Sequence, residues 1–319
     1  MPHISSDQWR VIGCVLVVIA LYVIGVVAIP GYGSEFSLRA MLVLASLLAI
    51  ASIGQTLVVI VGGIDLSIPF LIGFANVVAA QLYGSGMDFM AVMAIVMAIA
   101  LAVGALNGLI SSALNLHPLI VTLGVGTIVQ GSVLLWTGGF PSGSAPPVLS
   151  EFVSIGGSAA GLPVPWLVPS FVLLALAVSL VLSYTPYGRR LFALGSNPRA
   201  ARLSLINPIS MWVITFALSA GFAALTGILL LGFTGSAYGE VGQPYLFQTI
   251  AAVVVGGTAL VGGRGSYLGT VAGALVLTQI NTLLIGLGFQ PSMVQALLGA
   301  VILILVSLYG REAHLRNTI

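Results

Sequence analysis

The sequence predicts an all-α membrane protein with about ten transmembrane helices and with both termini in the cytoplasm. Hydrophobic residues make up 59% of the 319 residues and charged residues only 5%, whereas soluble domains carry about 25% charged residues. Too few charges are therefore present to cover a water-facing surface. In addition, apolar runs approach the roughly 20 residues that cross a bilayer, and arginines gather in alternate connections between those runs.

Ten apolar runs are long enough to be candidate spans, although the third is short. The first begins just after Arg10, exceeds the apolar core of a signal peptide and has no small-residue cleavage site behind it, so we expect a transmembrane helix there. The expected spans are residues 11–29, 38–61, 68–83, 89–114, 119–136, 166–184, 209–233, 245–261, 267–288 and 292–309.

The arginine distribution predicts the orientation of these spans. With a cytoplasmic N-terminus and ten alternating spans, eight of the nine basic residues fall on the cytoplasmic side, and only Arg39 falls outside. One missed or extra helix would invert every later loop, so the positive-inside pattern supports an even number of spans. The eight cytoplasmic positions are Arg10, Arg189, Arg190, Arg199, Arg202, Arg264, Arg311 and Arg316.

We expect residues 1–319 to form a single transmembrane domain with cytoplasmic tails at 1–10 and 310–319. The external loop 138–165 is rich in Gly, Ser and Pro, which fits either an irregular cap over the bundle or a docking surface for an external partner. The cytoplasmic loop 185–208 carries four arginines.

Several classes of chemistry are excluded or disfavoured by residue types that are missing or isolated. The chain has no lysine, so it holds neither a standard Walker A nucleotide site nor a Schiff base. Cys14 is the single cysteine and the three histidines are far apart in sequence, so we expect no disulfide, metal site or cofactor. A net charge of +2 gives no reason to expect a nucleic-acid partner.

The cytoplasmic loop contains a predicted helix of about two turns. Asn197 is a good N-cap, Pro198 suits the first helical position, and Asn207-Pro208 would end the helix. Basic side chains three residues apart share one helix face, and they either anchor the loop or dock a cytoplasmic protein. The predicted docking residues are Asn197, Pro198, Arg199, Ala200, Ala201, Arg202 and Leu203.

Three stretches resemble the sugar permeases of ABC importers of the ribose type. They are residues 187–204 (YGRRLFALGSNPRAARLS), 62–67 (GGIDLS) and 250–266 (IAAVVVGGTALVGGRGS), and the likeness extends over about 38–308. One departure from the family pattern is that Leu205 stands where glycine is usual after this loop helix. The others are Ile68-Pro69 in place of Val-Gly, and the sequence LFQT at 246–249 in place of a Glu-Leu-Asp-Ala pattern.

The resemblance implies a permease of the type II ABC importer fold in the bacterial inner membrane. A periplasmic binding protein would deliver a sugar or sugar alcohol, and a second permease chain, identical or not, would complete the path across the lipid bilayer. Separate ATPase subunits would contact the loop helix and supply the energy, so the chain itself would not be an enzyme. The missing lysine agrees with that division of labour.

Polar residues within the spans are candidates for lining a path, because amides both donate and accept hydrogen bonds. They serve equally well to join helices. We expect Gln55, Asn107 and Asn281 to line the path, and Asp65 and Arg264 to act as a cytoplasmic gate or cap.

The glycines of the third resembling stretch suit helix packing better than phosphate binding. Gly265, Gly269 and Gly273 are spaced by four, which lets transmembrane helices approach closely.

Three other functions are compatible with parts of the sequence. A branched-chain amino-acid permease belongs to the same broad superfamily. A secondary transporter or channel would use buried ionisable residues, for which Asp65 and Glu240 are candidates at span ends. A membrane protease would need a serine beside a histidine, and His117 at an interface is a poor candidate.

Overall fold

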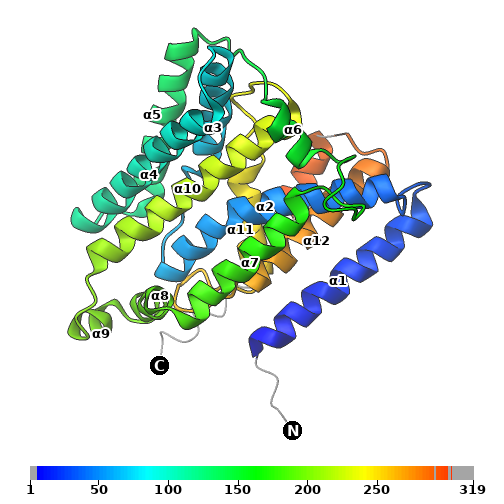
Figure 1. Cartoon of the computed structure of the whole chain (residues 1–319). Coiled ribbons are helices and arrows are strands. Elements are labelled where there is room, and N and C mark those ends of the chain that lie inside the picture. The colour runs from blue at the N-terminus through cyan, green and yellow to red at the C-terminus, as the bar shows by residue number, and fades with distance from the viewer. Residues whose placement is uncertain (1–5, 291, 301–302, 304–319) are drawn as a thin grey trace.

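A computed structural model describes residues 6–290, 292–300 and 303, and this part of the chain consists of helices and loops without a β-strand (Figure 1). Residues 292–300 are helical as well. The named helices are α1 (Ser6–Ala28), α2 (Glu35–Val61), α3 (Ile68–Gly84), α4 (Phe89–Ala113), α5 (Pro118–Thr137), α6 (Pro147–Val153), α7 (Leu167–Tyr184), α8 (Pro186–Ser196), α9 (Pro198–Leu203), α10 (Pro208–Thr234), α11 (Tyr245–Val255) and α12 (Tyr267–Gly286).

Nine helices correspond to the first nine expected spans. Six of them, α2, α4, α5, α7, α10 and α12, are long and apolar enough to cross a membrane, and shorter apolar helices stand at the positions of the other three. α1 starts at Ser6, earlier than expected, and α11 ends at Val255 rather than at 261. The tenth expected span is helical over 292–300. Most of its remaining residues and the tail 310–319 lie outside the described residues.

The centre of the bundle is formed by α2 and α10. α2 contacts α7, α8, α10, α11 and α12, and it is apolar and buried around its whole circumference over most of its length, as expected for a core helix. Gly54 of α2 packs directly on Ser219 of α10, where a Cβ would lie 2.6 Å from the serine Cα. α10 also contacts α3 and α4, so it joins the two sides of the bundle.

Small residues allow these helices to approach closely. Gly104 and Gly108, four apart on α4, face α10: a Cβ at Gly104 would overlap the carbonyl oxygen of Phe216, and one at Gly108 would lie 2.6 Å from that of Trp212. This is the small-residue spacing typical of membrane helix pairs.

The predicted packing role of the glycines at 269 and 273 is confirmed. A Cβ at Gly269 would overlap the carbonyl oxygen of Gly256, and one at Gly273 would overlap that of Ala252. Gly265 lies in the connection before α12, against the side chain of Thr258. Close contact between α11 and α12 therefore depends on the missing side chains.

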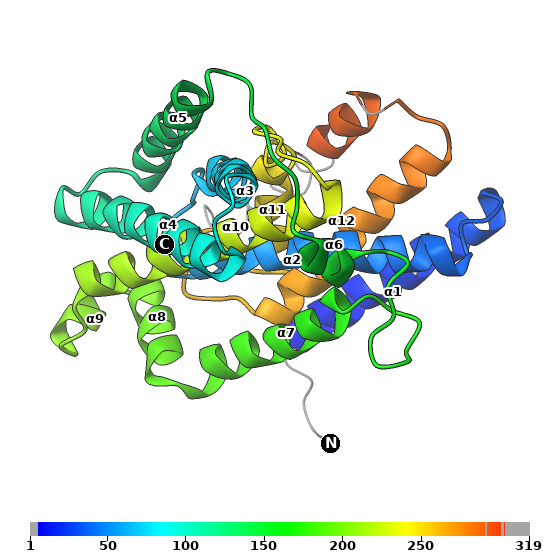
Figure 2. The ribbon, with the colours of Figure 1, turned by 45° about the horizontal axis from the view of Figure 1, so that its top comes forward.

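α1 lies at the periphery and packs mainly on α12 (Figure 2). The Tyr32 hydroxyl, in the turn after α1, donates to Oε1 of Gln279 at 2.7 Å. Much of α1 presents apolar side chains outward, including Leu16 and Val27, which are 61% and 83% exposed. A lipid environment explains such a surface.

The loop 138–165 is more ordered than its composition suggests, because it contains the short helix α6. Gly232 near the end of α10 packs on Leu149 of this helix. The Ala145 amide donates to the Gly235 carbonyl at 3.1 Å. These contacts favour the interpretation as a cap over the bundle.

Candidate translocation path and coupling segment

Residues 62–67 cross part of the bundle without helical structure. α2 ends at Val61, its C-cap Gly62 has the left-handed conformation (φ 98°), and α3 starts only at Ile68. Non-helical backbone at membrane depth is tolerated where protein buries it, and Asp65 and Ser67 are 2% and 0% exposed. This segment replaces one end of a helical span, which explains why α3 has only 17 residues.

Asp65 is bonded through both of its carboxylate oxygens. Oδ1 accepts from the Ser67 amide at 2.9 Å and from the Ser67 hydroxyl at 2.6 Å, and Oδ2 accepts from the Ser219 hydroxyl at 2.7 Å. Nδ2 of Asn107 donates to the Ser67 hydroxyl at 3.1 Å. We call Asp65, Ser67, Asn107 and Ser219 the Asp65 cluster; it joins the 62–67 segment to α4 and α10.

The Asp65 carboxylate meets the start of α3 by accepting from the amide of Ser67, the N-cap residue, rather than from an amide of the first helical turn. Ser67 occupies the N-cap position, but its side chain makes no capping bond, because its hydroxyl donates to Asp65. Ser219 lies eleven residues into α10, or ~16 Å along the helix, so the carboxylate is well inside the bundle. Whether Asp65 also takes part in a gate stays a prediction.

The three predicted path residues have three different environments. Asn107 belongs to the buried Asp65 cluster. Gln55 of α2 is fully buried, and neither its amide nitrogen nor its oxygen has a partner in the described part of the chain. Asn281 of α12 lines an open groove.

This groove lies between the start of α11, the end of α12 and the helical residues 292–300. It has a volume of about 270 Å³ and is lined by four side-chain amides, one aromatic ring and aliphatic residues. We call it the amide groove, after Gln243, Gln248, Asn281 and Gln295, with Phe247 as its aromatic residue. Sequence reasoning had included Asn281 but not the other three amides or Phe247.

The groove amides are available to a ligand. None of the four makes a side-chain hydrogen bond to another residue that the structure describes. Two other amides in the bundle are bonded within the chain. Asn76 accepts from the Tyr238 amide at 2.8 Å and donates to the Gly227 carbonyl at 3.4 Å, and Gln279 accepts from the Tyr32 hydroxyl at 2.7 Å.

The amide groove belongs to a face of the bundle that is open in the single chain. α3 contacts both α5 and α11, and Figure 2 shows α5 and residues 292–300 rising on either side of α3 and α11. On α5, Ile120, Ile128 and Leu135 are 73%, 68% and 86% exposed, and a Cβ at Gly124 would meet nothing within 4 Å.

The cytoplasmic loop of the prediction contains two helices, α8 and α9, which we call the coupling segment (186–203). As predicted, Asn197 caps α9 by accepting from the Arg199 and Ala200 amides at 3.1 Å each, with Pro198 in the first turn. The sequence analysis missed α8. Thr185 at its N-cap, followed by Pro186, is the same signal and could have revealed it.

The predicted end of this loop helix at Asn207-Pro208 is wrong. α9 ends at Leu203, and Leu205 follows in the left-handed conformation with φ 61°. Asn207 instead caps α10, accepting from the Ser210 amide at 3.3 Å.

Three backbone segments meet at the end of α8. A Cβ at Gly195 would overlap the carbonyl oxygen of Ile60, so this glycine permits direct contact between α8 and α2. The Gly263 amide donates to that same carbonyl at 2.8 Å, and the Ser196 hydroxyl donates to the Gly263 carbonyl at 3.3 Å. We call Ile60, Gly195, Ser196 and Gly263 the junction; the exposed Arg264 directly follows it.

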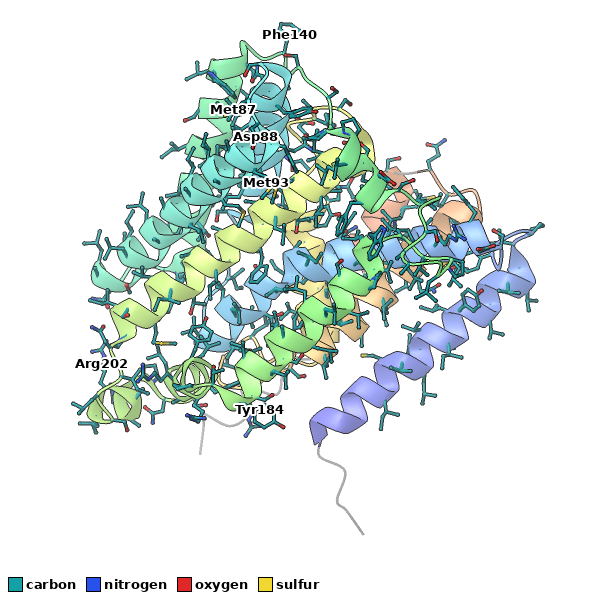
Figure 3. The ribbon with its side chains drawn as sticks, in the orientation of Figure 1. Met87, Asp88, Met93, Phe140, Tyr184 and Arg202 are labelled. Atoms are coloured by element: carbon teal, nitrogen blue, oxygen red, sulfur yellow. The ribbon has the colours of Figure 1, made fainter. Side chains whose placement is uncertain are left out.

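A second contact holds α8 to the bundle. The hydroxyls of Tyr187 and Thr215 of α10 are 3.1 Å apart. Burial raises the pKa of the Tyr187 phenol above its ordinary value, so the hydroxyl keeps its proton at neutral pH. Figure 3 places Arg202 and Tyr184 at one end of the molecule and Asp88 and Phe140 at the other.

Comparison with known proteins identifies the family of this chain. A family model described as "Branched-chain amino acid transport system / permease component" matches residues 37–306. The chain belongs to this permease family. It is therefore a multi-pass integral membrane protein.

Similar members of the family are import permeases. The ribose import permease of Escherichia coli K12 is 34% identical over 83% of this chain and 82% of its own length, and the galactose/methyl galactoside import permease of the same strain is 33% identical over 93% of each. The autoinducer 2 import system permease of Yersinia enterocolitica is 32% identical over 85% of this chain and 82% of its own.

The fold has a solved counterpart in a metal-chelate type ABC transporter in an inward-facing conformation. The TM-score is 0.53 at 16% identity, over 95% of this chain and 99% of that one. At this identity the similarity supports the fold alone, and it agrees with the expected ABC importer permease architecture.

Proposed function

We propose that this chain is the permease subunit of an ATP-driven importer in the bacterial inner membrane. A periplasmic binding protein delivers a sugar or sugar alcohol, and ATP hydrolysis takes place on partner subunits, so the chain is not itself an enzyme. The observation that carries the proposal is the junction, because it connects an exposed cytoplasmic segment to the buried segment 62–67.

The coupling segment is suited to transmit a push from an ATPase. Arg199 and Arg202 are exposed on α9, whereas Gly195 at the end of α8 touches Ile60, two residues before Gly62. A displacement of α8 therefore acts directly on the chain that leads to Asp65. Coupling of this kind needs a contiguous packed connection, and the junction and the Tyr187–Thr215 contact supply one.

The residues that line the amide groove favour a neutral polyhydroxylated solute. Its four amides offer both donors and acceptors, and Phe247, 59% exposed, offers an apolar ring face. An amino acid would bring a carboxylate and an ammonium group, but none of the groove residues is charged. The ribose and galactose permeases among the similar proteins point to the same solute class.

A second permease chain completes the path in this proposal. The open face between α5 and residues 292–300 bears the amide groove and exposes aliphatic side chains beside small residues. A partner helix packs well on such a surface. Two chains facing each other would enclose the groove between them.

The proposal is tested by purification from the native membrane in mild detergent, followed by mass spectrometry. We expect an ATPase to co-purify with the chain.

Replacing Arg199 and Arg202 together by Glu should weaken that association at least tenfold and leave membrane insertion unchanged, because the exposed charges are reversed. The matched control replaces Arg189 and Arg190 by Glu, the same charge change on α8. Equal association of the Arg199/Arg202 variant and the natural chain would refute docking through α9.

A further inference from the structure

The coupling segment ends in an exposed apolar tip. Leu203, the last residue of α9, is 87% exposed, and Leu205 is 95% exposed, the highest value among the large apolar side chains that the structure describes. Both leucines fall on the cytoplasmic side of the predicted topology, and Figure 1 shows α9 at one end of the molecule, next to α8. The tip is therefore not explained by contact with the bilayer core.

The backbone at Leu205 is also in an unfavourable conformation. Its φ of 61° lies in the left-handed region, which L-residues with a Cβ rarely adopt. The bend itself has an ordinary purpose: the Leu205 amide donates to the Arg202 carbonyl at 3.0 Å and the Ile206 amide to the Ala201 carbonyl at 3.1 Å, which closes the end of α9. Glycine is the residue that usually fills this position at helix ends.

Neither the bend nor the packing of the single chain accounts for a leucine at 205. Glycine would form the same bend without strain, and a side chain that is 95% exposed contributes almost no burial within this chain. Backbone strain that nothing local requires is a reason to look for a role in function. Burial of the side chain by another protein would offset both costs.

We propose that the Leu205 side chain, assisted by Leu203, is an apolar anchor that inserts into a pocket on the ATPase subunit. This inference rests on the proposed function and identifies the residue that carries the contact. The neighbouring Arg199 and Arg202 are exposed, and no acidic residue lies within the coupling segment. A partner surface with an apolar pocket and an acidic rim therefore fits the tip, an arrangement typical of interface hot spots.

The test uses the full chain in detergent and the ATPase that co-purifies with it. Leu205→Ala removes the side chain but keeps a Cβ in the left-handed conformation, whereas Leu205→Gly removes the side chain and the strain. We expect both variants to bind the ATPase about tenfold more weakly. The melting temperature of the permease alone should rise for Leu205→Gly and stay unchanged for Leu205→Ala.

Leu114→Ala is the matched control, since Leu114 is an exposed leucine (64%) just after α4 at another predicted cytoplasmic turn, and we expect its ATPase affinity to be unchanged. Association of Leu205→Ala within twofold of the natural chain would overturn the anchor. If the Arg199/Arg202 charge reversal still weakens binding in that case, docking through α9 is supported and only the role of Leu205 as an anchor is refuted. If neither Leu205→Ala nor the charge reversal weakens binding, docking through α9 is refuted as well.

Discussion

The Asp65 cluster and the amide groove both place polar side chains within the membrane-spanning bundle, yet they differ in how those side chains are bonded. Both carboxylate oxygens of Asp65 accept hydrogen bonds from within the chain. The amides of the groove accept and donate none within the described residues. The difference suggests that free hydrogen-bonding capacity in a side chain that is not fully buried, rather than residue type, separates side chains available to a solute from those that join helices.

The largest effect on stability is expected from Asp65→Ala. The change removes three hydrogen bonds, worth roughly 2 kcal/mol together at ~0.6 kcal/mol each in a membrane bundle, and leaves buried hydroxyls without acceptors. The apparent melting temperature in detergent should fall clearly. Asp88→Ala, which removes an exposed helix cap on α4, should cost no more than about 1 kcal/mol. Equal losses for the two variants would show that the cluster contributes little to stability.

Substitutions in the amide groove should lower solute uptake without lowering stability. We expect Gln248→Leu combined with Asn281→Leu to leave the melting temperature unchanged, because neither amide is bonded within the described chain. Solute uptake by the assembled importer should fall by about tenfold, as two hydrogen bonds to the solute are lost. A matched control is Gln279→Leu on the same helix, which breaks the bond to Tyr32 and should lower stability instead. Normal uptake by the double variant would remove the groove from the path.

Asn107→Ala tests whether an amide of the cluster behaves as structure. Its Nδ2 donates a single bond, to Ser67, so we expect a loss of about 0.6 kcal/mol. Uptake per folded molecule should stay normal when it is measured beside the melting temperature. A loss of uptake without a loss of stability would show that Asn107 lines the path.

The smallest change is expected for Gln55→Leu. Both polar atoms of this buried amide lack partners in the described part of the chain, and replacing an unsatisfied buried polar group by an apolar one of similar size is neutral or stabilising. We therefore expect a melting temperature that is unchanged or slightly higher, and normal uptake. A sharp fall in uptake would show that Gln55 faces the solute or water of the path.

Local features of the site were predictable from sequence, and long-range ones were not. Asn197-Pro198 is a helix start whose signal lies within four residues, and α9 begins there. The bond between Asp65 and Ser219 joins residues 154 apart, and no spacing rule points to it. Asn107 and Asn281 looked equivalent, because their difference lies in neighbouring helices.

The coupling segment illustrates the same limit. The positive φ at Leu205 could not be read from a sequence in which the expected glycine is absent. The contact of Gly195 with Ile60 depends on how α8 folds back on α2, which the composition of the loop does not reveal.

Uptake by liposomes that contain the purified chain, with and without the co-purifying ATPase, is the most direct measurement of the proposed mechanism. The vesicles would be supplied with the accompanying binding protein and a panel of radiolabelled monosaccharides. We expect accumulation of a sugar only when the ATPase and ATP are both present on the cytoplasmic side, and no accumulation with the Arg199/Arg202 charge reversal. Uptake by the chain alone, without ATP, would contradict the importer and favour a secondary transporter.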